Sequence, residues 1–142
     1  MKLKLLFLFV CLSALSCKQE PESAFNMDIE PLSTKAELKT ASWIGYKEFS
    51  FELQNIADNF SKEFAVERTR NLLSAAQSVL YSMPGELRNE TTNDKASEMV
   101  EATKALYNAM TQKSEEEIIE GFNKITAAFS GLNTEINYYT EN

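Results

Sequence analysis

The chain has no histidine among its 142 residues, and this absence excludes several classes of functional site at once. Ser-His-Asp and Cys-His catalysis, histidine-ligated haem, and the usual zinc and Glu-x-x-His di-iron sites all need an imidazole. No pair of carboxylates is marked by its spacing as facing inward, so general acid–base catalysis has no support either. We therefore expect a non-enzymatic protein that needs no cofactor and no metal.

Cysteine, proline and glycine are also scarce. Both cysteines, Cys11 and Cys17, lie near the N-terminus, so no disulfide within the chain can stabilise a domain that follows them. Three prolines and four glycines are too few for a chain of many strands and tight turns, which favours an all-α fold. Acidic residues outnumber basic ones, 21 to 14, and an acidic protein repels phosphate backbones. We expect no nucleic-acid partner.

The first seventeen residues differ in pattern from the rest of the chain. Lys2 and Lys4 precede an apolar run that is too short to span a bilayer comfortably. Small residues and then Cys17 follow this run, and the arrangement resembles the lipobox of bacterial lipoproteins. The resemblance implies a signal peptide of residues 1–16, cleavage after Ser16, and a diacylglyceryl group on the Cys17 thiol. The alternative is an ordinary secretory signal that is cut near the same place.

The residues after Cys17 indicate where such a protein would be held. Lys18 in the second position resembles lipoproteins that are sorted to the outer membrane. Two or three acyl chains would bind the protein to the membrane without embedding it. Residues 17–33 carry Pro21, Pro31, serines and acids, which predicts a flexible tether. We expect a lipid-anchored protein of the cell envelope, at the periplasmic face or the cell surface of the outer membrane.

Residues 34–142 predict four amphipathic helices, of which the last, residues 114–139, is the clearest. Its large apolar residues follow one another at alternating steps of four and three, which is the spacing of a buried stripe in a bundle. These residues are Ile118, Phe122, Ile125, Phe129, Leu132, Ile136 and Tyr139. The segment begins with Ser114 and Glu117, a capping-box pattern that marks the start of a helix.

The other three helices are bounded by caps and breakers. The first begins at Thr34 and ends in the cap-rich segment 57–61; the second ends near Met83, before Pro84; the third begins near Asn93. The connections are short or moderate, so the prediction is an up-down-up-down four-helix bundle. Length and pattern loosely resemble the soluble cytochrome bundles, but the chain has none of their haem ligands.

One group of large apolar residues does not fit a single buried face. Ile44 and Phe51 are seven residues apart and lie opposite the predicted core face of the first helix, with Trp43 at the boundary. Large apolar side chains aligned on the back of a helix, with an indole beside them, can bind a protein partner or a second copy of the chain. The alternative is internal packing of these residues against a folded-back tether around Phe25 and Ile29.

Two further groups have a simpler structural explanation. Met83, Met99 and Met110 are soft ligands of the type that binds monovalent copper, but methionine on a buried stripe more often fills gaps in a core. The glutamates of residues 115–120 coincide with a helix start, where the helix dipole stabilises acids. The sequence thus predicts an envelope lipoprotein that presents a helical domain to a protein partner. The alternative is a protein that binds a small ligand or metal ion between its helices.

Overall fold

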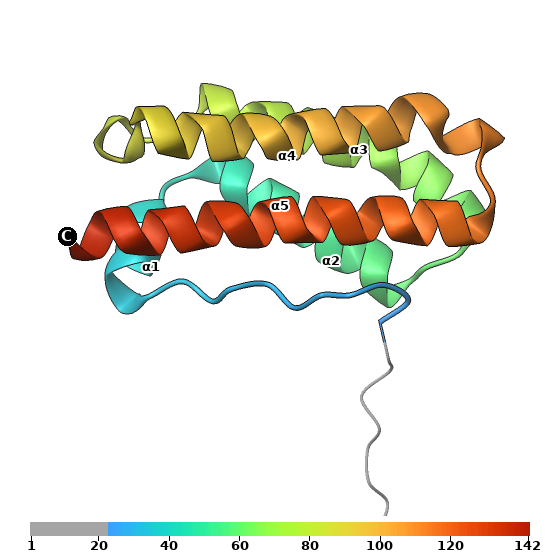
Figure 1. Cartoon of the computed structure of the whole chain (residues 1–142), viewed down its shortest axis with the longest axis horizontal. Coiled ribbons are helices and arrows are strands. Elements are labelled where there is room, and N and C mark those ends of the chain that lie inside the picture. The colour runs from blue at the N-terminus through green and yellow to red at the C-terminus, as the bar shows by residue number, and fades with distance from the viewer. Residues whose placement is uncertain (1–22) are drawn as a thin grey trace, which may run out of the picture.

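The computed structural model describes residues 23–142, and within this range the chain is all-helical, which confirms the predicted all-α class. Its elements in order are α1 (Thr34–Thr40), α2 (Ile44–Asp58), α3 (Lys62–Tyr81), the 3-10 turn η1 (Gly85–Leu87), α4 (Glu90–Ala109), the 3-10 turn η2 (Met110–Gln112) and α5 (Glu115–Glu141). The long helices pack mainly against their neighbours in the chain, α2 on α3, α3 on α4, and α4 on α5 (Figure 1).

Polar side chains begin four of the five helices of this range. Ser33, Ser61, Asn89 and Ser114 each accept a hydrogen bond from the backbone N–H three residues on, at 2.9 to 3.3 Å. The capping box predicted at Ser114 is confirmed, because the Glu117 carboxylate also accepts from the Ser114 N–H. The first helix starts as predicted at Thr34, but its cap is Ser33, one residue earlier than the sequence pattern indicated.

The predicted first helix is in fact two helices. The break expected within residues 57–61 is present, since α2 ends at Asp58 and α3 begins at Lys62. A second break separates α1 from α2, and its cause is Trp43, whose indole N–H donates to the Val79 carbonyl of α3 at 3.1 Å. The chain must turn there to bring the indole into the core, which no local spacing reveals.

Close contact between α2 and α3 continues at Gly45. A β-carbon at this position would lie 2.4 Å from the backbone carbonyl carbon of Ser78, so the contact requires glycine. The Gly45 N–H also donates to the Ser82 hydroxyl at 3.3 Å. The start of α2 is therefore fixed against the end of α3, and this sets which residues of α2 face outward.

The core is formed around the apolar stripe of α5. Six of its seven predicted members are buried: Ile118, Phe122, Ile125, Phe129, Leu132 and Ile136. Tyr139, the predicted seventh, is exposed near the end of the helix. We call these six buried residues the apolar stripe.

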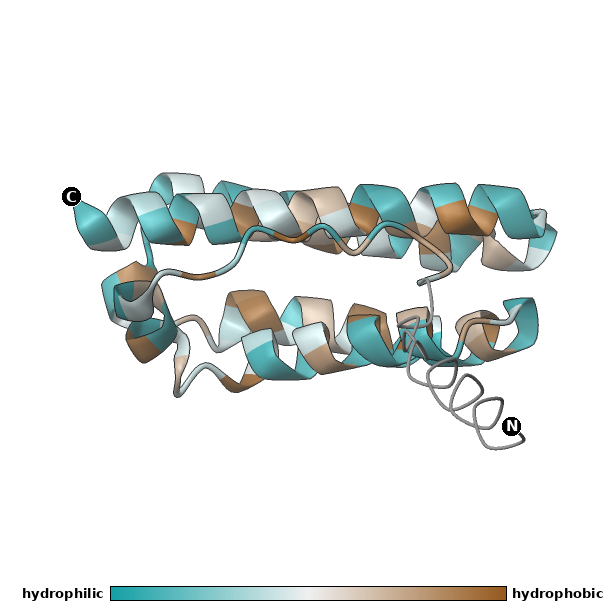
Figure 2. Cartoon of the chain, turned by 90° about the horizontal axis from the view of Figure 1, so that it is seen from below, coloured by the Kyte–Doolittle hydropathy of each residue, from teal (hydrophilic) through white to brown (hydrophobic). Residues whose placement is uncertain are grey.

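Residues 25–33 are not a free tether but an extended segment that lies along α5, and we call them the strap. Figure 1 shows it running beside α5 in the same direction, and Figure 2, seen from below, shows it lying over the helices from outside. Its inward residues are Phe25, which is buried, and Met27, Ile29 and Leu32, which are partly buried against the core. A flexible tether was predicted for residues 17–33. The structure differs from this prediction over residues 25–33, which are docked on α5.

Candidate interaction surfaces

The outer face of α2 carries two of the residues singled out from the sequence. Ile44 and Phe51 are 65% and 67% exposed, while Phe49, Leu53 and Ile56 of the same helix are buried. The prediction that both face away from the core is therefore confirmed. The strap bonds to α5, and both side chains stay largely exposed, so it does not cover them. We call Ile44, Glu48 and Phe51, which are spaced by four and three residues, the α2 outer face.

Trp43 does not belong to this surface. The sequence placed it at the boundary of the candidate surface, but its side chain is fully buried. Its ring lies 5.5 Å from that of Tyr46, and its N–H is satisfied by α3. A buried indole needs a partner for its N–H, and the open carbonyl near the end of α3 provides one. Trp43 thus orients α2 from within.

A shallow hollow of about 290 Å³ lies beside Phe51, between α2 and α3. Its lining residues are Glu48, Phe51, Glu52, Asn71, Ser74 and Ala75. The Glu52 carboxylate is paired with Arg68 of α3, at 2.5 and 2.6 Å from one guanidinium nitrogen. The α2 outer face thus carries two exposed apolar side chains with Glu48 between them, next to a depression that a partner's side chain can enter.

A second surface, which sequence reasoning missed, is the groove beneath the strap. Polar residues of α5 repeat at steps of three and four beside the apolar stripe, and we call them the polar stripe: Asn123, Thr126, Ser130, Asn133 and Asn137. The backbone N–H groups of Asn26, Glu30 and Ser33 donate to Asn123 Oδ1, Ser130 Oγ and Asn137 Oδ1, each at 2.8 Å. Asn133 and Asn137 donate in return to the carbonyls of Glu30 and Pro31, at 2.7 and 2.8 Å.

Aromatic rings hold the N-terminal end of the strap. Phe25 stacks on Phe122 of α5 with the ring centroids 4.8 Å apart, and meets the edge of Phe60, which follows α2, at 6.2 Å. Phe60 and Phe122 are themselves in edge contact at 6.3 Å. The strap therefore inserts one aromatic ring between groups from two sides of the groove.

Tyr46 connects the groove to the core. Its hydroxyl donates to Asn133 Oδ1 at 2.8 Å, while the amide nitrogen of Asn133 donates to the strap. Burial of the phenol raises the pKa of Tyr46 to about 12, since the charged phenolate would lose its water. The hydroxyl thus stays protonated and available as a donor at ordinary pH.

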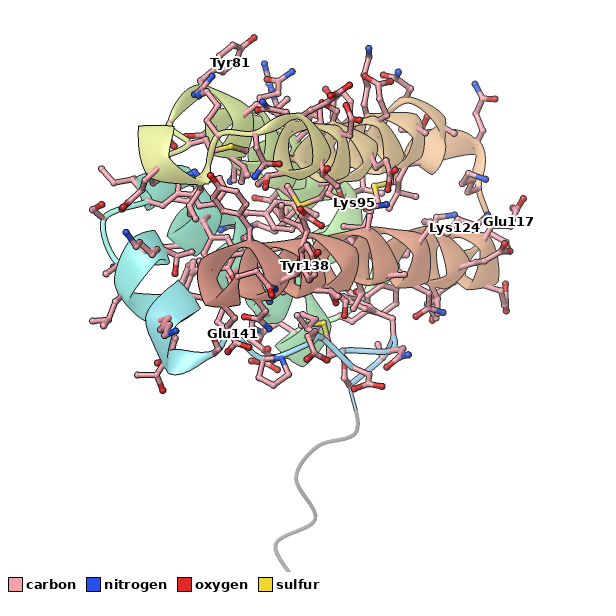
Figure 3. The ribbon with its side chains drawn as sticks, turned by 60° about the vertical axis from the view of Figure 1, so that its left-hand side comes forward. Tyr81, Lys95, Glu117, Lys124, Tyr138 and Glu141 are labelled. Carbon is pink, nitrogen blue, oxygen red and sulfur yellow. The ribbon has the colours of Figure 1, made fainter. Side chains whose placement is uncertain are left out.

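The remaining candidates keep a structural explanation. Met83, Met99 and Met110 are all buried among the core residues. Glu117 is exposed, and its pKa is lowered chiefly by the hydrogen bond from the Ser114 backbone N–H; that of Glu120 is lowered chiefly by its bond with Lys124. Figure 3 shows Glu117 and Lys124 together at the solvent-exposed beginning of α5. Residues 23–142 contain no group of three or more acids that is arranged to hold a metal ion.

A further hollow of about 330 Å³ lies between α4 and α5. It is lined by small, apolar and charged residues: Ala102, Ala105, Leu106, Ala109, Lys113, Glu117, Glu120, Gly121 and Lys124. The hollow is open to solvent.

Two further findings concern relatives of the chain and its relation to membranes. Comparison with protein families, with curated proteins and with solved structures gives no match. Within residues 23–142, no helix has the length and the apolar character needed to cross a membrane. Cys17, the residue singled out for lipidation, lies outside the described residues.

Proposed function

We propose that this chain is a lipid-anchored protein of the cell envelope whose helical domain binds a protein partner, or a second copy, through the α2 outer face. The observation that carries the proposal is the exposure of Ile44 and Phe51 on a helix that is fixed in place on its other side. Exposed apolar residues that are scattered singly are ordinary, whereas two large ones aligned on one rigid helix form a docking surface. The role is that of an adaptor or assembly factor and not of an enzyme.

The proposed architecture is an up-down-up-down four-helix bundle of α2 to α5, to which α1 is added at one end. Two features support it. Each long helix packs against the next one in the chain, and the connections are short. Sequential helices with short connections favour antiparallel neighbours. A rigid bundle suits an adaptor, because a partner then meets a surface that needs no ordering before it binds.

The proposed anchor is the lipid on Cys17, with residues 1–16 removed as a signal peptide. Its support is the leader sequence, in which a basic start, an apolar run and small residues precede the cysteine. Metabolic labelling with a radioactive fatty acid tests it directly. We expect the natural chain to be labelled and the Cys17→Ala variant to be unlabelled. Labelling that persists in the variant would refute the anchor.

Affinity purification from cross-linked cells tests the partner surface. The Ile44→Asp/Phe51→Asp variant should stay helical and lose the recovered partner, since both residues are largely exposed. A matched control is Leu38→Asp/Tyr138→Asp, an aliphatic and an aromatic residue that are 75% and 66% exposed on α1 and α5. The control should keep the partner. Loss of the partner in both variants, or its recovery with both, would contradict the assignment to α2.

Sedimentation of the same three proteins distinguishes a second copy from a different partner. A self-associating chain should sediment as a dimer, and the α2 variant alone should sediment as a monomer. If all three are monomeric while a cross-linked partner is still lost, the partner is a different protein.

A second candidate function is binding of a small ligand or a metal ion, and the hollow between α4 and α5 is the observation that favours it. Ligand binding to the folded state raises the melting temperature, so a thermal-shift panel of metal ions and metabolites tests this reading. A compound that stabilises the natural chain, but not the Ala105→Trp variant in which an indole is added to the lining of the hollow, would support it.

A further inference from the structure

The hydrogen bonds that hold the strap depend little on its own sequence. All five hydrogen bonds between the polar stripe and the strap involve backbone N–H and carbonyl groups of the strap, and none involves one of its side chains. Any extended polypeptide carries these groups at the same intervals. The polar stripe is therefore a surface that reads an extended backbone.

The spacing of the polar stripe matches an extended chain. Asn123, Ser130 and Asn137 are seven residues apart in turn, which is about 10.5 Å along a helix at 1.5 Å per residue. Their strap partners, residues 26, 30 and 33, are four and then three residues apart. Three extended residues span about 10 Å at 3.3 Å per residue, so a heptad of helix matches about three residues of strand.

The four-residue interval is longer than the heptad, and the strap bends there to fit. The Asp28 N–H donates to the Asn26 side chain, and the Ile29 N–H donates to the Met27 carbonyl at 2.9 Å. In this register Thr126, between Asn123 and Ser130, is level with the bend. Its side chain is buried and its hydroxyl has no hydrogen-bond partner. The stripe thus offers one more polar group than the strap uses.

Side chains of the strap provide the selectivity that the backbone contacts lack. Phe25, Met27 and Ile29 alternate inward, and Asn26, Asp28 and Glu30 alternate outward into solvent. Phe25 is the only strap residue among the buried apolar residues, and the rest of the core comes from the helices and their connections. Most of the core would therefore remain if the strap left its groove.

We propose that the groove along the polar stripe is a binding site for an extended segment of a partner protein, and that the strap is its intramolecular occupant. The segment it fits has an aromatic residue at the place of Phe25 and apolar residues at alternate places after it. A partner strand that runs straight past Thr126 would use the hydroxyl that the strap leaves unpaired. This site is separate from the α2 outer face and does not rest on it.

Release of the strap would also change the reach of the domain, a consequence that rests on the proposed lipid on Cys17. The span from Cys17 to the docked Phe25 is eight residues, or at most about 26 Å. With the strap free, the span to Ser33 is sixteen residues, or at most about 53 Å. Binding of a partner strand would thus let the domain move further from the membrane.

The test uses a fluorescent peptide with the sequence of residues 23–33 and the full chain in detergent. The strap is first weakened by Phe25→Ser, which removes the inserted ring, and Glu30→Pro, which removes the N–H that donates to Ser130. Fluorescence anisotropy should show saturable binding to this opened variant. The natural chain should bind at least about tenfold more weakly, because a docked strap leaves few grooves free.

Substitutions on α5 locate the binding. Ser130→Ala/Asn137→Ala, added to the opened variant, should reduce peptide affinity at least about tenfold. Thr134→Ala/Thr140→Ala is the matched control, because these two hydroxyls bond only to carbonyls of their own helix. The control should bind the peptide as the opened variant does. A peptide that carries Phe25→Ser should not bind.

Four outcomes would overturn the proposal. One is the absence of saturable binding to an opened variant that is still helical. Another is binding that the Ser130 and Asn137 substitutions leave unchanged. A third is a strap whose amides stay protected from hydrogen exchange in the opened variant, which would make it a fixed part of the core. The fourth is a dimer of the natural chain that dissociates when Phe25 is replaced, which would assign the groove to the strap of a second copy.

Discussion

The apolar and polar stripes of α5 run side by side along one helix with the same alternation of three and four residues. They nevertheless contact different kinds of structure, helices in one case and an extended segment in the other. The apolar stripe packs mainly against side chains of the other helices and adds one ring stack, Phe122 on Phe25 of the strap, whereas the polar stripe bonds to the backbone of the strap. Spacing alone decides only that a row of side chains shares a face. The chemistry of the row decides whether its partner is a helix or an extended segment.

The two stripes should also contribute differently to stability. Burial of apolar side chains is the main favourable term in folding. Truncation of a large buried residue loses the contribution of the removed atoms and leaves a cavity that costs further free energy. A hydrogen bond that replaces bonds to water contributes only about 0.5–1.5 kcal/mol net. We therefore expect the apolar stripe to determine whether the domain folds, and the polar stripe to determine where the strap lies.

The largest effect is expected from Phe122→Ala in the apolar stripe. This change removes a fully buried ring and the surface on which Phe25 stacks, and should lower the free energy of unfolding by about 3–5 kcal/mol. Urea denaturation followed by circular dichroism measures it. Tyr138→Ala, at an exposed position of the same helix, is the control and should change stability by less than about 0.5 kcal/mol. A loss below 1 kcal/mol at Phe122 would contradict the division of roles.

A smaller loss is expected from Asn133→Leu, the central substitution of the polar stripe. It leaves the Tyr46 hydroxyl and the Glu30 carbonyl without their partner, and should cost about 2–3 kcal/mol. Hydrogen exchange of the strap amides should become faster at the same time. Asn123→Leu, which loses only an exposed bond to Asn26, should cost about 1 kcal/mol or less. Equal costs at both positions would show that burial of the amide is unimportant.

The pH dependence of stability tests the connection between the two stripes at Tyr46. The pKa of this buried phenol is about 12 in the folded state, against about 10 in an unfolded chain. The folded state holds the proton more tightly, so its advantage is complete below pH 10 and is lost as the pH rises from 10 to 12. The expected loss is about 2–3 kcal/mol.

Other groups also titrate above pH 10, so the measurement compares the natural chain with Tyr46→Phe at each pH. The substituted chain is expected to be the less stable of the two at pH 8, because it lacks the bond to Asn133. The difference between them should shrink between pH 10 and 12. Two stability curves that stay parallel across this range would mean that the phenol is well solvated.

Local patterns explain which features could be predicted from the sequence. The burial of Phe122 and Phe129, the cap at Ser114 and the outward direction of Ile44 and Phe51 all follow from helix periodicity and capping. The burial of Trp43 and the break before α2 do not, because they depend on a carbonyl of α3 that is distant in the sequence. The binding role proposed for the α2 outer face stays a prediction.

A tether folded back around Phe25 and Ile29 was one alternative from the sequence, but its docking on α5 could not be predicted, for a different reason. Its ligands for α5 are backbone atoms, which every residue has, so residues 25–33 carry no mark of the contact beyond the alternation of Phe25, Met27 and Ile29. The sequence signal for this contact lies on α5 instead, where the polar residues Asn123, Ser130 and Asn137 are spaced by seven residues. A heptad of amides and hydroxyls beside an apolar stripe indicates a face that is covered by backbone rather than left to solvent.

The smallest effect, and the only gain in stability, is expected from Thr126→Val in the polar stripe. The hydroxyl of Thr126 is buried without a hydrogen-bond partner, and valine has nearly the same shape without the cost of burying a polar group. We expect the free energy of unfolding to rise by about 1 kcal/mol, measured by urea denaturation. Thr103→Val is the control, because that buried hydroxyl donates to the Met99 carbonyl, and its loss should not stabilise the protein. A destabilised Thr126→Val variant would contradict this expectation, because it would show that the hydroxyl has a hydrogen-bond partner in solution.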